Sequence, residues 1–279
     1  MKKNFLILGI IAMFLFFVGC GTKEKEDEKY GLFLHKNIRA TTFWAGEDAS
    51  DANGNITNVE SAWDDNWDKK FGGKEDSPTC KRDDNFIPVG YSGTENLYYY
   101  ALQYNDMDKL VFEYEKASAA DIEKIKNSNP NYRKSGTNVN TTDMSDGRKN
   151  NVKDIPWYNS KNWSGNESVV KGRWLKVRCV EQGKGNGEWV YAQWLDAGPY
   201  YYDDFDYVFG KATQKNDDSF YKVGSGSGID LSPAVILKMG IKDMGASGIN
   251  TLVDWQFVDD KDVPDGPWKI HVSDNKTYW

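Results

Sequence analysis

The first 20 residues constrain this chain most strongly, because they determine which part of it folds and in which compartment. The apolar stretch Phe5–Val18 carries no charge, follows two lysines and ends just before Gly19 and Cys20. A basic start, an apolar run and a small residue together are typical of a secretion signal. The run is shorter than the about 20 apolar residues that a membrane-spanning helix needs. With this stretch removed, about 259 of the 279 residues remain to fold after export.

The end of this signal, Phe17-Val18-Gly19-Cys20, resembles a bacterial lipobox in which phenylalanine replaces the usual leucine. The resemblance implies that Cys20 becomes the lipid-modified first residue, and that the mature protein is anchored to the membrane on the periplasmic or surface side of a bacterial cell envelope. The charged tract that follows predicts a flexible tether over residues 21–35. The folded part is then expected over residues 36–279.

Composition excludes one class of partner. The formal charge of −7 becomes −9 once Lys2 and Lys3 are removed with the signal. Nucleic-acid phosphates are bound by clustered Lys and Arg, so nucleic acid is not expected as a partner. The 11 Trp, 16 Tyr and 13 Phe exceed what one core of this size needs. Aromatic rings stack on sugars at a surface, but they also fill barrel cores, and the composition leaves both uses open.

Cysteine and histidine patterns point to no metal or cofactor. Besides Cys20 the chain has Cys80 and Cys179, which either pair after export or leave Cys179 as a small buried hydrophobe. The only histidines, His35 and His271, sit near opposite ends of the mature chain. No spacing of zinc ligands results, and a histidine-based catalytic triad would depend on one of these two residues.

The C-terminal half has the clearest local patterns. Alternation of side chains predicts antiparallel strands over 174–179 and 188–195, joined by a glycine-rich hairpin, and a last strand over 252–258. Ser232 as N-cap, with Pro233 behind it and Gly240 as terminator, predicts a short helix. Weaker patterns predict strands at 40–45 and 96–104, a strand or helix start at 110–114, a short helix at 118–126 and a polar insertion at 127–154. Many short strands with one or two short helices are typical of a mainly β barrel.

Two motifs give this barrel a family resemblance. Asp196-Ala197-Gly198-Pro199-Tyr200 is followed, thirty residues after Tyr200, by Asp230-Leu231-Ser232. The pair resembles the rare lipoprotein A-like proteins, in which a strand ends in Asp-Arg-Gly-Pro-Phe and a short helix begins with Asp-Leu-Ser. The barrel is also similar to that of expansins and family-45 endoglucanases. The resemblance implies a six-stranded double-psi β-barrel with long loop insertions, its core at about 40–47, 97–105 and 172–258.

The resemblance also implies where the chemistry lies. Asp230 occupies the position of the catalytic aspartate, with Asp196 as a second carboxyl. The family-45 aspartate of the first strand is absent from Phe43-Trp44-Ala45, which leaves Glu47 as the nearest acid. Trp44, Trp194, Tyr200 and Tyr202 are the predicted sugar-binding aromatics. Two alternatives stay open: Asp230 serves only to start the helix, and Asp196 only forms a turn.

These carboxyls favour some glycan chemistries over others. An inverting glycosidase needs two carboxyls about 6.5–9.5 Å apart, one of which activates water. A lytic transglycosylase needs one acid that later acts as a base, and an expansin-like protein needs only the binding surface. The sequence therefore predicts an envelope lipoprotein that binds peptidoglycan or another polysaccharide, with lytic cleavage or no cleavage. The alternative is a non-catalytic lipoprotein that binds a partner and uses the barrel as a scaffold.

Overall fold

The structure is a computed structural model that describes residues 32–48, 57–73, 75, 80–107, 148–159, 167–199, 202–214, 226–242 and 250–278. The predictions for Cys20, for Tyr200, for the element at 110–114 and for the helix at 118–126 lie outside these residues.

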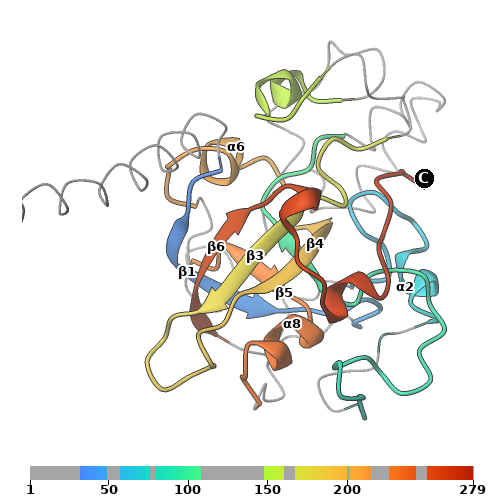
Figure 1. The fold of residues 1–279 in the computed structure, drawn as a ribbon. Helices are drawn as coiled ribbons and strands as arrows, with labels where there is room; N and C mark the ends of the chain where they lie inside the picture. Colours follow the sequence, from blue (N-terminus) through green and yellow to red (C-terminus); the bar gives the residue numbers. More distant parts are fainter. Residues whose placement is uncertain are drawn as a thin grey trace, which may run out of the picture.

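Six strands close into a barrel in the order β1-β5-β2-β4-β3-β6 (Figure 1). The strands are β1 (His35–Thr42), β2 (Tyr99–Leu102), β3 (Trp174–Cys179), β4 (Val190–Ala197), β5 (Ile229–Leu231) and β6 (Thr251–Phe257). Closure leaves every strand paired on both sides, so the sheet has no open edge. The fold class predicted from the sequence, a mainly β protein built on a six-stranded barrel, is confirmed.

The pairing directions divide the barrel into two equivalent halves. The pairs β1/β5 and β2/β4 are parallel, and the other four pairs are antiparallel. Exchanging β1 with β4, β2 with β5 and β3 with β6 converts every pair into a pair of the same direction. One half consists of β1, β2 and β3, and the other of β4, β5 and β6. Strand β5 lies between β1 and β2, and β3 lies between β4 and β6. This interlocking is the double-psi arrangement.

The helices are short and lie outside the barrel (Figure 1). They are α2 (Trp67–Lys70), α6 (Phe205–Val208) and α8 (Pro233–Lys238), with 3₁₀ turns η3 (Asn150–Asp154), η4 (Asp260–Asp262) and η5 (Pro267–Lys269). The predicted helix is confirmed as α8: the Ser232 hydroxyl accepts a hydrogen bond from the Val235 N–H, and Gly240 at φ +84° ends the helix. Within the described ranges, no helix has the length and apolar character needed to cross a membrane.

Strand β1 differs most from its prediction. It begins at His35 inside the predicted tether and ends at Thr42, so Phe43 is no longer in a strand. Its first residues are polar and give no local strand pattern. They are held by β6 instead, because His35 pairs with Trp255 and Ile38 with Val253. Pairing between segments distant in the sequence has extended the strand beyond its local preference.

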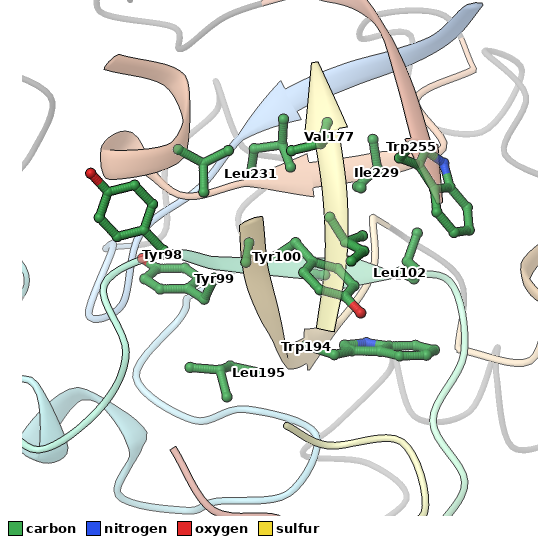
Figure 2. Close-up of a cluster of buried hydrophobic side chains, with 14 of the residues drawn as sticks. Tyr98, Tyr99, Tyr100, Leu102, Val177, Trp194, Leu195, Ile229, Leu231 and Trp255 are labelled. Atoms are coloured by element: carbon green, nitrogen blue, oxygen red, sulfur yellow. The ribbon is translucent and has the colours of Figure 1, made fainter. Parts of the chain in front are cut away.

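Much of the aromatic content fills the barrel interior (Figure 2). Trp194 of β4 stacks on Tyr100 of β2 and on Phe257 of β6, with ring centroids 5.8 Å apart in both pairs. All three side chains are fully or almost fully buried. Since β6 neighbours neither β2 nor β4, their side chains meet through the interior. Cys179 is also buried and forms no disulfide. Of the two alternatives, a disulfide or a small buried hydrophobe, the structure shows the second.

Candidate functional site

Four residues lie side by side across four neighbouring strands. Thr41 of β1 pairs with Asp230 of β5, Asp230 pairs with Ala101 of β2, and Ala101 pairs with Asp196 of β4. Tyr100, the residue before Ala101, points into the barrel, so this row lies on the outer face. Adjacent strands are about 4.8 Å apart, which places the Cα atoms of the two aspartates at about 10 Å from each other.

A β-bulge turns Asp196 toward this outer face. Tyr100 pairs with Trp194, but the next residue, Ala101, pairs with Asp196, so Leu195 is the extra residue of β4. In a regular strand, residues two positions apart point to the same side. Without the bulge, Asp196 would follow Trp194 toward the interior. Bulges commonly redirect a side chain in this way, and here the extra residue brings a carboxyl to the face of Asp230.

Asp196 is the more buried member of the carboxyl pair. Its side chain is 8% exposed, and Oδ1 accepts hydrogen bonds from the N–H groups of Ala62 and Ala197, both at 2.8 Å. Burial raises the pKa of this carboxyl to about 7, although the two N–H donors act in the opposite direction. The negative charge of Asp230 raises the pKa further. Asp230 is therefore close enough to influence the ionisation of Asp196.

Asp230 is partly exposed. Burial raises its pKa to about 7; a hydrogen bond from the Thr41 hydroxyl to Oδ1 lowers the pKa, and the charge of Glu47 raises it. The Thr41 hydroxyl also lies 2.7 Å from the Ser227 hydroxyl. Ser232, and not Asp230, provides the side-chain cap of α8. Asp230 is thus engaged with the side chains of the outer face, and its contacts favour a role there over that of a helix-start residue.

Glu47 reaches the site from the turn after β1. Its Oε2 accepts a hydrogen bond from the Asn58 side chain at 3.1 Å, and its carbonyl accepts one from the Asn58 N–H at 3.0 Å. Because its charge acts on Asp230, the three carboxyls predicted from the sequence, Asp196, Asp230 and Glu47, come together. No set of three or more His, Cys, Asp or Glu side chains suited to a metal ion occurs in the described part of the chain.

A buried polar cluster fixes the turn that carries Glu47. The Ala45 N–H donates to the Tyr99 hydroxyl at 2.9 Å, and this hydroxyl donates to Glu75 Oε2 at 2.5 Å. Arg82 pairs with the other oxygen of Glu75 at 2.9 Å. The Glu75 N–H donates to the Ala45 carbonyl at 2.9 Å. Both the N–H and the carbonyl of Ala45 are therefore hydrogen-bonded to this cluster, which holds the turn in place. No sequence pattern had assigned a function to this cluster.

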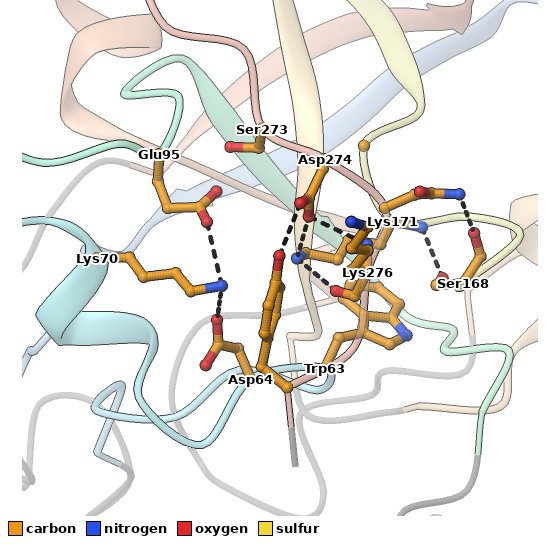
Figure 3. A network of polar contacts seen from close by, with 12 residues as sticks. Trp63, Asp64, Lys70, Glu95, Ser168, Lys171, Ser273, Asp274 and Lys276 are labelled. Carbon is orange, nitrogen blue, oxygen red and sulfur yellow. Dashed lines mark hydrogen bonds and ion pairs between the residues drawn. The ribbon is translucent and has the colours of Figure 1, made fainter. Parts of the chain in front are cut away.

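Polar contacts join the C-terminal segment to the loop that donates to Asp196, and Figure 3 shows those around Lys70 and Asp274. The Tyr278 N–H donates to the carbonyl of Trp63, the residue after Ala62, at 2.8 Å. The Lys70 ammonium lies 3.1 Å from the centre of the Tyr278 ring and 2.6 Å from Asp64. The loop that donates to Asp196 is therefore anchored by residues at the far end of the sequence, a contact that no local pattern predicts.

The predicted sugar-binding aromatics have different environments. The Trp194 ring is fully buried in the core, so the prediction that it binds sugar is wrong. Trp44 is partly exposed just after β1, and its buried indole N–H has no partner among the described residues. Tyr202 is also partly exposed, and its carbonyl accepts a hydrogen bond from Lys149 at 2.7 Å. Of the four predicted aromatics, Trp44 is the one that precedes the Glu47 turn directly.

Exposure determines which carboxyl meets a ligand. Thr41 and Asp230 are partly exposed, whereas Ala101 and Asp196 are buried. On this face Asp230 is therefore the more accessible of the two carboxyls. Because both pKa values are raised to about 7, the two carboxyls together hold about one proton near neutral pH. Thr41 is the residue of this site that sequence reasoning missed, although it lies in the Thr41-Thr42-Phe43-Trp44 stretch that suggested the first strand.

Comparisons with known proteins gave no match, either to a family model or to a curated protein or solved structure.

Proposed function

We propose that this protein is a lipoprotein of the bacterial cell envelope, anchored through Cys20, whose barrel binds polysaccharide on the outer face around Asp230. The observation that carries the proposal is the pair of carboxyls with raised pKa values on one outer face, of which Asp230 is accessible. The ring of Trp44, partly exposed after β1, provides an apolar surface for a sugar. The barrel and its motifs support placing the protein near the rare lipoprotein A-like and expansin families.

The geometry favours proton donation by Asp230 over hydrolysis. A carboxyl with a pKa of about 7 is about half protonated at neutral pH, as a general acid must be. Asp230 would give its proton to the glycosidic oxygen and, as a carboxylate, would then take a proton from the sugar hydroxyl that attacks. Activation of water needs a second carboxylate in contact with solvent, and Asp196 is buried. Lytic cleavage, as in lytic transglycosylases, is therefore the proposed reaction.

Incubation of the mature domain with purified peptidoglycan and with cellulose tests this proposal. Retention on one polymer with release of anhydro-sugar fragments is the expected result. Retention without fragments would support an expansin-like role, in which the same face binds glycan and the acid is not used for cleavage. Absence of retention on both polymers would overturn polysaccharide binding.

A second candidate is a non-catalytic envelope lipoprotein that uses the barrel to bind a protein partner. The two backbone hydrogen bonds of Asp196 favour it, because they give this carboxyl a structural role that needs no substrate. Under this alternative, Asp196→Asn and Asp230→Asn would change stability and leave glycan retention at the background level of the parent.

A further inference from the structure

We infer that Gln103 is a positioning residue that fixes the two site carboxyls relative to each other. This inference rests on the carboxyl pair of the proposed function. Gln103 directly follows β2 and lies two residues beyond Ala101, the residue that separates Asp196 from Asp230. Gln103 lies at the bend where β2 ends, between the chain leaving β4 and the chain entering β5.

The Gln103 amide bridges the two segments that carry the carboxyls. Its Nε2 donates to the Pro199 carbonyl at 3.0 Å and to the Ser227 carbonyl at 2.9 Å. Pro199 lies three residues after Asp196, and Ser227 lies three residues before Asp230. One side chain thus joins the chain leaving β4 to the chain entering β5.

Hydrogen bonds extend from this bridge to Asp230. The Ser227 hydroxyl lies 2.7 Å from the Thr41 hydroxyl, and Thr41 donates to Asp230 Oδ1. On the other side, the Gly198 N–H donates to the Leu102 carbonyl at 2.9 Å, which holds the chain next to Pro199 against β2. Displacement of the Gln103 amide would therefore change the surroundings of both Asp196 and Asp230.

The environment of Gln103 selects an amide at this position. The side chain is fully buried, and its Oε1 has no hydrogen-bond partner among the described residues. The two hydrogen bonds donated by Nε2 therefore determine the orientation of the amide. A flipped amide or a glutamate carboxylate would place an oxygen against the two carbonyl oxygens of Pro199 and Ser227.

Gln193 provides a control that loses more hydrogen bonds than Gln103, because its Oε1 also accepts from the Asn96 side chain and from the Ser273 N–H, both at 2.9 Å. It is also buried, and its Nε2 donates to two backbone carbonyls, Gly172 at 3.0 Å and Ser273 at 3.2 Å. These carbonyls belong to segments that carry neither site aspartate. The variants Gln103→Met and Gln193→Met each remove two such donors at nearly constant side-chain volume. Only the first removes the bridge between the carboxyl-bearing segments.

The experiment is a carbon-13 NMR titration of the aspartate carboxyls in the folded protein, with assignments from Asp196→Asn and Asp230→Asn. In Gln103→Met the two segments loosen and water reaches the pair, so we expect both apparent pKa values to fall by about one unit or more. Gln193→Met should titrate like the parent. A folded Gln103→Met protein whose carboxyls titrate like the parent would overturn the inference.

Gln103→Asn keeps the test decisive if Gln103→Met does not fold. It retains a buried amide that is one CH₂ shorter, so it cannot donate to the Pro199 and Ser227 carbonyls together. We expect both carboxyl resonances to titrate at lower pH than in the parent; titration like the parent would overturn the role of Gln103. Neither titration uses a glycan. Failure of polysaccharide binding would therefore overturn the proposed function, and failure of the titration difference would overturn only the role of Gln103.

Discussion

Asp196 and Asp230 are the two cross-strand partners of a single residue, Ala101 of β2. One partner lies on a parallel neighbour and the other on an antiparallel neighbour. The arrangement places two carboxyls on one face of the barrel. Strand β2 lies between their strands, and at this level its side chain is only the methyl group of Ala101. This arrangement explains why the ionisation of Asp196 responds to the charge of Asp230.

The first prediction concerns how the carboxyl pair links stability to pH. Both folded pKa values are about 7, above the about 3.9 of an unfolded aspartate. The folded protein therefore keeps protons that the unfolded chain releases, so the stabilisation from the pair is full below about pH 4 and is lost as the pH rises to about 7. Urea unfolding from pH 4 to 8 should show a larger loss in the parent than in the Asp196→Asn/Asp230→Asn double variant. Equal losses in the two proteins would contradict the raised pKa values.

The second prediction concerns the proposed acid. Asp230→Asn preserves the volume of the side chain and its hydrogen bond from Thr41, but removes the proton that would reach the leaving oxygen. Glycan cleavage should fall by roughly 10²–10⁴-fold. Quantification of released fragments measures the effect, with Asp260→Asn on the exposed η4 turn as the control that leaves cleavage unchanged. Retention of full cleavage by Asp230→Asn would exclude the acid role.

The third prediction separates the two tryptophans proposed for sugar binding. Trp194→Ala should lower the free energy of unfolding by about 3–5 kcal/mol, because it leaves a cavity in the core. Trp44 is partly exposed, so Trp44→Ala should lower stability less and should weaken retention on glycan. Chemical denaturation and polymer pull-down measure the two effects. Normal retention by a folded Trp44→Ala protein would remove this residue from the binding surface.

The fourth prediction uses His35, whose ring stacks on Trp255 with centroids 3.8 Å apart and an angle of 7°. Burial lowers the pKa of His35 to about 3, below the about 6.5 of an unfolded histidine. Its stabilisation is present above about pH 6.5 and is lost as the pH falls toward 3, by up to about 1.4 kcal/mol per pH unit. His35→Phe keeps a stacking ring that does not titrate. The difference in unfolding free energy between variant and parent should therefore grow in favour of the variant as the pH falls, and a constant difference would contradict this account.

The fifth prediction tests the anchor. Two acyl chains on Cys20, with each buried CH₂ contributing about 0.8 kcal/mol, should hold the mature protein stably at a membrane. Cys20→Ser should abolish labelling with a palmitate analogue and move the protein into the soluble fraction, with Cys80→Ser as a labelled control. A Cys20→Ser protein that stays in the membrane fraction would exclude lipidation as its anchor.

Local residue patterns were enough to predict the elements that have strong local signals. Alternation of side chains predicted the β3–β4 hairpin and β6, because a half-buried strand repeats every two residues. The cap at Ser232 and the terminator at Gly240 predicted α8, because these residues satisfy or end the helix through local backbone geometry. The two motifs then predicted the barrel and named Asp196, Asp230 and Glu47.

How those carboxyls meet depends on contacts between segments that are distant in the sequence. The bulge at Leu195 turns Asp196 outward, and it exists because β4 pairs with β2, about 90 residues away in the sequence. Trp194, which lies two residues before Asp196, fills the core for the same reason. Gln103 gains its role only when the segments around Pro199 and Ser227 converge on it. Strand register and loop convergence depend on contacts between distant segments. A local pattern of residues does not determine which distant segment a strand or loop will pair with.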